Sequence, residues 1–142
     1  MGLERFEHGA VVATLNDSAQ VAARRMRDFH VGCVIVTRGV HPVGILTDRD
    51  LAMRVVAEGR DPEETKIADI VTYDVTTVPR DSGISTAAYL MKTHGVRRLP
   101  IVDADGKVTG VVTADDLMTL LAAEIGDVGA GIREGVDAPD SR

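Results

Sequence analysis

Two motifs place a hydroxyl and a carboxylate three residues apart, directly after an apolar run. Thr47 precedes Asp50 in the first motif, and Thr113 precedes Asp116 in the second. A helix that begins at such a motif presents free backbone N–H groups, which favour an anionic ligand. Its carboxylate can accept hydrogen bonds from a pair of neighbouring hydroxyl groups. The motifs therefore suit a ligand that carries both hydroxyls and a phosphate.

Arg97 and Arg98 are the best candidates to contact that phosphate, because a guanidinium matches phosphate with a fork of donors. Adjacent strand residues point to opposite faces, so we expect only one of the pair, Arg98, to enter a cleft. The alternative is a solvent-exposed pair. A second basic cluster, Arg24 to Arg27, lies in a helical pattern and is interpreted as a solvated face.

Structural roles compete with these interpretations. Thr-x-x-Asp is also a capping box, and capping and binding can coexist at one motif. Cys33 lies in an aliphatic run and is interpreted as a buried, inert thiol. The four histidines lack ligand spacing, so no metal site is expected. No nucleophile, base and orienting group occur together, so we expect no enzymatic activity.

An internal repeat organises the motifs. Identical residues recur at a spacing of 65 to 66 positions, which favours a duplication. The recurring residues are Ala22, Ala23, Met26, Val31, Gly44, Thr47, Asp50 and Leu51, which return as Ala87, Ala88, Met91, Val96, Gly110, Thr113, Asp116 and Leu117. Each copy should therefore position its motif with the same elements.

Each copy is predicted to contain a strand, a helix, two strands and a second helix. Asp17 or Ser18 can cap the first helix, and Asp81 or Ser82 can cap its counterpart. Short β-branched runs predict the strands, and the second helices begin at Thr47 and Thr113. The runs that predict strands are 31–36, 43–46, 75–78, 99–102 and 108–112.

The predicted organisation is a first repeat over residues 1–62, a second over 63–125 and a flexible tail over 126–142 without a fold of its own. A three-stranded unit of about 50 residues cannot cover both faces of its sheet. We therefore expect an α/β (α+β) fold in which the two repeats pack sheet to sheet and share one core.

The segments Gly44–Asp50, Gly110–Asp116 and His94–Asp103 make the chain similar to the tandem cystathionine β-synthase (CBS) domain pair, or Bateman module, of short stand-alone bacterial proteins. The resemblance covers about residues 9–124. It implies two ligand sites in the cleft between the repeats, related by a pseudo-two-fold axis. It also implies adenosine derivatives as ligands, chiefly AMP, ADP or ATP, with NAD and S-adenosylmethionine not distinguished and no cofactor required.

The resemblance assigns the sites residue by residue. In the family the motif aspartate holds ribose, the threonine lies near ribose or phosphate, basic strand residues reach phosphate, and aliphatic side chains sandwich adenine. One site takes Thr113, Asp116, Arg97, Arg98, Val11 and Val31, and the other takes Thr47, Asp50, Val75 and Val96. Because the first repeat has Gly32 and Cys33 where the second has its arginines, we expect the second of these sites to lack phosphate contacts from that strand.

Composition limits the partners. Net charge is −6, which disfavours binding to nucleic acid, and no apolar run is long enough to span a membrane. We expect a cytoplasmic protein with a client protein that the sequence does not identify. The second helices carry more aliphatic residues than one face needs, so we expect a homodimer. A ligand-free structural module that acts through its dimer surface, and an enzyme that acts on a nucleotide, remain the alternatives.

Overall fold

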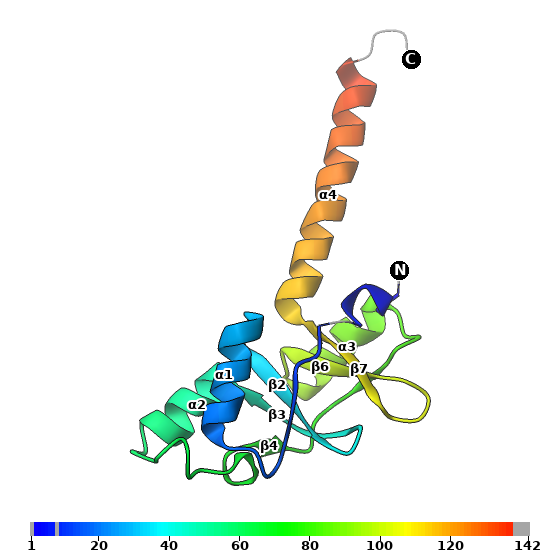
Figure 1. Ribbon diagram of the computed structural model, residues 1–142. Helices are drawn as coiled ribbons and strands as arrows, with labels where there is room; N and C mark the ends of the chain where they lie inside the picture. Colours follow the sequence, from blue (N-terminus) through cyan, green and yellow to red (C-terminus); the bar gives the residue numbers. More distant parts are fainter. Residues whose placement is uncertain (1, 8, 138–142) are drawn as a thin grey trace.

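A computed structural model describes residues 2–7 and 9–137, and Figure 1 shows two repeats side by side with one long helix projecting from them. Each repeat has the predicted order of strand, helix, strand, strand and helix. The first contains β1 (Val12–Thr14), α1 (Ala19–Phe29), β2 (Cys33–Arg38), β3 (His41–Thr47), and α2 (Asp48–Leu51), which continues as the π-helix η2 (Ala52–Val56). The second contains β5 (Val78–Pro79), α3 (Ile84–His94), β6 (Arg98–Val102), β7 (Val108–Thr113) and α4 (Ala114–Asp137).

The two repeats form separate sheets. The first sheet has the order β1-β2-β3-β4 and the second has the order β5-β6-β7. In each, the opening strand is parallel to the next, and a hairpin follows. Strand β4 (Thr72–Tyr73) comes from the connection between the repeats and pairs with β3, after the 3-10 turn η3 (Ile67–Asp69). The predicted opening strand of the second copy is therefore shorter than 75–78, because only Val78 and Pro79 pair.

Capping interactions and left-handed residues define the ends of α1 and α3. The Ser18 hydroxyl accepts a hydrogen bond from the Val21 N–H at 3.2 Å, which confirms the first predicted cap. The predicted counterpart at Asp81 or Ser82 is wrong, because α3 has Gly83 at its N-cap and no side-chain cap. At the other ends of α1 and α3, His30 and Gly95 adopt left-handed backbone conformations that terminate the helices.

The expectation of one shared core is wrong, because the buried residues form two clusters, one under the helices of each repeat. The first cluster contains Ala13, Ala19, Ala22, Met26, Val34, Val36, Leu46, Val55, Ile67, Ile70 and Val71. The second contains Leu3, Val78, Ala87, Met91, Leu99, Ile101, Val112 and Leu117. Each sheet is covered by its own helices on one face, so each repeat buries its own core. Ile35, fully buried but in neither cluster, lies on the opposite face of β2.

Segments that precede each repeat pack on the other repeat. Leu3, at 0% exposure, belongs to the second cluster, whereas Ile67 and Ile70 belong to the first. Gly110 and its counterpart Gly44 allow these crossings, since a Cβ on Gly110 would collide with backbone atoms of residues 6 and 7, and one on Gly44 would lie 2.8 Å from the Thr72 carbonyl oxygen. Packing therefore crosses the predicted division at residue 62.

The N-terminal segment, which contains the short 3-10 turn η1 (Glu4–Phe6), makes two further contacts with the second repeat. The Arg80 guanidinium forms an ion pair with Glu7 at 2.9 Å, and Gly2 bridges Gly83. The hairpin tips of the two repeats meet as well, because the Val108 N–H donates to the Val40 carbonyl at 3.1 Å. These contacts fix the cleft between the repeats.

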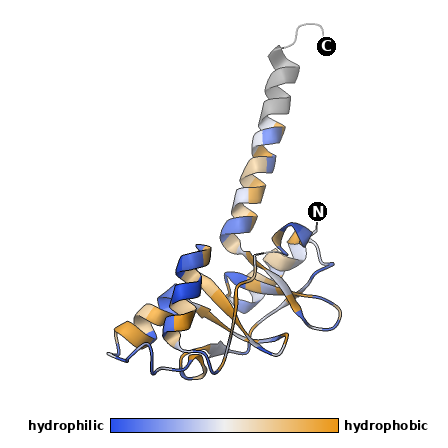
Figure 2. Ribbon diagram, in the orientation of Figure 1, coloured by the Kyte–Doolittle hydropathy of each residue, from blue (hydrophilic) through white to orange (hydrophobic). Residues whose placement is uncertain are grey.

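The prediction that residues 126–137 have no fold is wrong, because α4 runs from Ala114 to Asp137. Glycines weaken a helix by about 1 kcal/mol each but do not terminate one that is already formed. The projecting part of α4 carries exposed apolar residues, which Figure 2 shows as orange segments. Residues 138–142 of the predicted tail lie outside the described residues. No helix in the described ranges is both long and apolar enough to cross a membrane.

Candidate functional site

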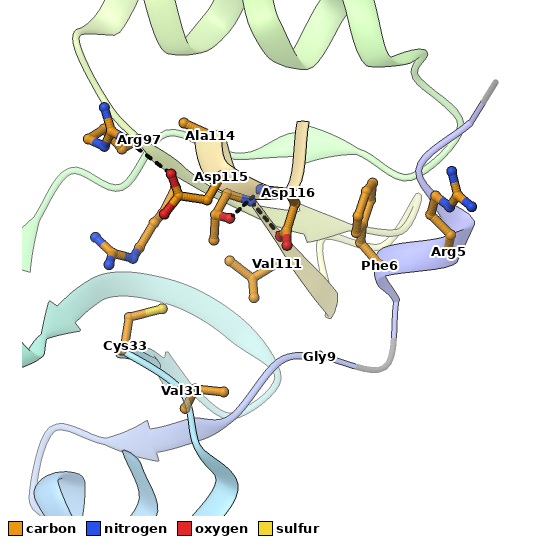
Figure 3. A pocket seen from close by; sticks show the side chains of 13 residues that line it. Arg5, Phe6, Gly9, Val31, Cys33, Arg97, Val111, Ala114, Asp115 and Asp116 are labelled. Carbon is orange, nitrogen blue, oxygen red and sulfur yellow. Dashed lines mark hydrogen bonds and ion pairs between the residues drawn. The ribbon is translucent and has the colours of Figure 1, made fainter. Parts of the chain in front are cut away.

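The larger candidate site is a pocket of about 450 Å³ between the repeats (Figure 3). The start of β2 contributes one wall, and the end of β7 with the start of α4 contributes the opposite wall. Figure 3 shows Asp115 and Asp116 across the pocket from Val31 and Cys33. The lining residues are Arg5, Phe6, Gly9, Val31, Gly32, Cys33, Arg97, Arg98, Val111, Thr113, Ala114, Asp115 and Asp116.

The start of α4 arranges polar groups toward this pocket. The Asp116 N–H donates to the Thr113 hydroxyl at 3.0 Å, and the Thr113 N–H donates to Oδ2 of Asp116 at 3.0 Å. This reciprocal pair is the capping box expected from the sequence. In the described part of the chain no hydrogen bond or ion pair engages the other carboxylate oxygen of Asp116. A half-buried carboxylate with a free oxygen can accept hydrogen bonds from a ligand in the pocket.

A smaller pocket of about 260 Å³ lies beside the first motif. It is lined by Ile45, Thr47, Thr72, Tyr73, Asp74, Val75, Thr76, Val96, Arg97 and Arg98. Its apolar side chains come from both repeats, as the predicted pseudo-two-fold arrangement requires.

Asp50 does not line this smaller pocket. It forms the matching capping box with Thr47, and its second oxygen lies 3.6 Å from the Arg54 guanidinium. Arg54 also donates to the Ile70 carbonyl at 2.6 Å and so holds the connecting segment. Leu120 replaces Arg54 in the second repeat, counting four residues from each aspartate. Both carboxylate oxygens of Asp50 therefore have protein partners, whereas one oxygen of Asp116 has none among the described residues.

The structure corrects the expectation that only Arg98 enters a cleft, and it adds cations of the second repeat to the smaller pocket, where the sequence analysis assigned none. Both residues line both pockets, so the smaller pocket does have cations. Strand alternation does not separate them, because β6 begins at Arg98 and Arg97 precedes it. Arg97 is 68% exposed and pairs with Asp115 at 3.3 Å. Arg98 is half-buried and lies close to Gly32, where an added Cβ would lie 3.4 Å from its Nη2 atom.

Of the four valines predicted to line the two sites, three do so. Val31 lines the larger pocket and Val75 and Val96 line the smaller one, but Val11 lines neither and packs against the first core. The two segments that cross the paired glycines correspond at a spacing of 66 residues, since an added Cβ on Gly110 would meet the carbonyl oxygen of Phe6 and one on Gly44 that of Thr72. At that spacing the counterpart of Val75 is Gly9, which does line the larger pocket.

The sequence analysis also missed Arg5 and Phe6, which line the larger pocket from the N-terminal segment. The same spacing of 66 would have found them, because they correspond to residues 71 and 72. Thr72 lines the smaller pocket. The internal repeat could therefore have identified these residues, if its spacing had been applied to the segment that precedes each copy.

Cys33 is expected to react slowly with alkylating reagents. The thiol is only 7% exposed, and burial raises its pKa, an effect that the nearby Arg98 guanidinium opposes. A raised pKa lowers the thiolate fraction at pH 8, and the thiolate is the reactive form. Iodoacetamide labelling followed by mass spectrometry should therefore be slower in the folded chain than in urea. Equal rates at pH 8 would show that the thiol is accessible and ionised.

Comparisons with known proteins agree with this arrangement. The family model described as CBS domain matches residues 7–57 and 67–123. The CBS domain-containing protein YhcV of Bacillus subtilis is 38% identical over 109 residues, which cover 75% of this chain and 76% of YhcV. MK0525 of Methanopyrus kandleri is 39% identical over 109 residues, but these cover 76% of this chain and only 56% of MK0525.

Solved structures share the fold. A protein with CBS domains from Burkholderia ambifaria is 30% identical, with a TM-score of 0.73 over 85% of this chain and 88% of its own. The CBS domain pair of MJ0100, in complex with 5′-methylthioadenosine and S-adenosyl-L-methionine, has a TM-score of 0.75 at 24% identity, over 85% and 99% of the two chains. PAE2072 of Pyrobaculum aerophilum, complexed with AMP, has a TM-score of 0.72 at 22% identity, over 84% and 96%. The repeated fold, its paired motifs and the two matched segments together show that this chain belongs to the CBS-domain family.

Proposed function

We propose that the chain is a regulatory module that binds an adenosine derivative in the larger pocket and is not an enzyme. One observation carries this proposal: the pocket brings the open carboxylate of Asp116 together with two arginines and with apolar residues of the other repeat. Ribose hydroxyls, phosphate and adenine are complementary to these three kinds of group.

Each group has a distinct role in this proposal. The free oxygen of Asp116 accepts hydrogen bonds from the ribose hydroxyls. Arg98 donates to a phosphate, and Arg97 can join it by leaving its exposed pair with Asp115, since exposed ion pairs contribute little stability. Val31 and Val111 contact the two faces of the base, one from each repeat. Binding therefore joins the repeats, and a change in their relative angle is the signal that a client protein would detect.

The ligands of related folds support the adenosine class. PAE2072 was solved with AMP, and the CBS domain pair of MJ0100 with 5′-methylthioadenosine and S-adenosyl-L-methionine. The two arginines favour a phosphorylated member, and we take AMP as the first candidate, followed by ADP and ATP. S-adenosylmethionine and NAD are the further candidates.

A thermal-shift screen tests the proposal. At 100 times its dissociation constant a ligand stabilises the folded chain by about 2.7 kcal/mol, which is readily detected. We expect stabilisation by AMP, ADP or ATP, with no product formed from ATP over several hours. No stabilisation by any of the five candidate ligands would favour the ligand-free structural module, and product formation would favour an enzyme.

We also propose that the module is a homodimer that pairs through its exposed apolar helix surface. On α4 this surface consists of Met118, Leu121, Ile125 and Val128, all more than half exposed. Their spacing of three, four and three residues places them on one side of the helix. Met53 and Val56 are similarly exposed in the first repeat. Apolar residues gathered in this way are typical of an interface between subunits.

Replacing Ile125 with glutamate should shift the chain toward monomer. Ile125 is 71% exposed, so the variant should fold normally but place a charge in the apolar interface. Light scattering at micromolar concentration should give a dimer mass for the wild type and a lower average mass for Ile125→Glu. Ala123→Glu adds the same charge on the far side of α4 and should remain dimeric. A monomeric wild type, or equal masses for all three proteins, would contradict the proposed interface.

A further inference from the structure

Arg97 and Arg98 lie between the two pockets and line both of them. The larger pocket has one further basic residue, Arg5, whereas the smaller pocket has no other lysine or arginine among the described residues that line it. The smaller pocket does have a carboxylate, Asp74. Any phosphate in the smaller pocket therefore depends on the same two guanidinium groups that a phosphate in the larger pocket would use.

Arg98 is the more constrained member of the pair. It is half-buried, and within the described ranges it forms no ion pair shorter than 4.0 Å. Asp48 lies on the same side of Gly32 as Arg98, since an added Cβ on Gly32 would lie 3.4 Å from both Arg98 Nη2 and Asp48 Oδ2. A half-buried cation without a close carboxylate is available to an anionic ligand, but its fork can face only one ligand well at a time.

We propose that the two pockets compete for this arginine pair, so that a phosphorylated ligand in one pocket weakens binding of a second phosphorylated ligand in the other. This inference rests on the proposed function and extends it to the relation between the pockets. The larger pocket takes the phosphorylated adenosine, because Asp116 is open there and Arg5 adds positive charge. The smaller pocket takes an uncharged adenosine-like ligand when the larger pocket is filled.

The lining of the smaller pocket supports this assignment. Ile45, Val75 and Val96 give it an apolar surface, and the threonine hydroxyls beside them can hydrogen bond without charge. Asp50, the carboxylate that would match Asp116, does not line it. With the arginines drawn to the other ligand, a second phosphate would face Asp74 and a like-charged phosphate, and both oppose its binding.

Calorimetric titration of the full chain with AMP and with adenosine tests the proposal. For AMP we expect two binding steps, the second at least about tenfold weaker, because it lacks a charge-assisted hydrogen bond that the first step has used. Adenosine should bind both pockets with no such coupling, so adenosine in one pocket should leave AMP affinity in the other unchanged. Equal, independent AMP steps would overturn the proposal, whereas absence of heat with either ligand would overturn the proposed function itself.

The two AMP steps could also differ because the pockets have different affinities without any competition. Blocking one pocket and measuring AMP affinity in the other separates these two explanations. Val111→Trp fills the larger pocket with an uncharged side chain, and the smaller pocket should then bind AMP at least about tenfold more tightly than in the second step of the wild type. An Arg97→Gln/Arg98→Gln double variant should narrow the gap between the two AMP steps, leaving only the difference that Asp116 and Arg5 make to the larger pocket. Arg60→Gln removes a charge at an exposed residue that lines neither pocket and should leave both steps as in the wild type. An unchanged gap in the double variant would also overturn the proposal, and this result does not depend on Val111→Trp folding.

Discussion

Replacing Asp116 with alanine is expected to lower affinity for AMP by about 10- to 100-fold, because the variant loses charge-assisted hydrogen bonds to ribose. Such bonds contribute roughly 1.5 to 3 kcal/mol, and each 1.4 kcal/mol changes a dissociation constant about tenfold. The substitution also removes the capping-box acceptor for the Thr113 N–H. We therefore expect stability to fall by about 0.5 to 2 kcal/mol as well. Calorimetry and thermal melting measure the two effects separately.

Asp50→Ala is the matched control for this experiment. It removes the same capping-box acceptor, from the Thr47 N–H at 2.9 Å, and also the ion pair with Arg54. Asp50 lines neither pocket, so the loss should appear in stability while AMP affinity in the larger pocket stays within about threefold. If Asp116→Ala lowered stability and left AMP affinity unchanged, its motif would be a cap without a binding role.

Replacing Gly110 with alanine should displace the N-terminal segment from the second repeat. The added Cβ would collide with the Phe6 carbonyl oxygen and lie 2.6 Å from the Cα of Glu7, and backbone atoms cannot move aside as a flexible side chain can. Overpacking costs about 1 to 3 kcal/mol, and exposing the buried Leu3 would add a similar amount. We expect a loss of at least about 2 kcal/mol in the free energy of unfolding, measured by urea denaturation.

AMP affinity should fall in the same variant, because Arg5, Phe6 and Gly9 line the larger pocket. Gly126→Ala is the control, since nothing lies within 4 Å of the position that its Cβ would occupy. Alanine at that helical position should be neutral or stabilise by up to about 1 kcal/mol. A Gly110→Ala chain as stable as the wild type would show that the N-terminal segment does not pack as described.

Most of the correct predictions about the fold and the motifs followed from the internal repeat. Because Thr47 and Thr113 each follow a glycine-led strand in the same register, the order of elements and both capping boxes were predictable from one copy applied to the other. The motif glycines were visible in sequence, but their role was not. Gly44 and Gly110 are required because a segment from outside the repeat crosses each of them, and such a crossing is a long-range contact that local patterns do not reveal.

The errors have the same origin. Val11 was chosen in place of Gly9 because the segments before each copy share no identities that would fix their register. The arginines were assigned to one site because the family pattern attaches them to the motif of their own repeat. Strand alternation was then expected to separate them, but it does not apply to Arg97, which precedes its strand. The second half of α4 was missed because its glycines lower helix propensity, although the helix has already formed upstream at Leu117.

Nuclear magnetic resonance titration of the isotopically labelled chain with AMP tests the central claim most directly, because it reports both binding and location. We predict saturable changes in the backbone amide signals of residues 31–33 and 111–116, on the two walls of the larger pocket. Signals of the exposed residues 60–64, in the connection between the repeats, should stay unchanged. No saturable change, or changes confined to surfaces away from the pocket, would contradict the assignment of this cleft as an adenosine-binding site.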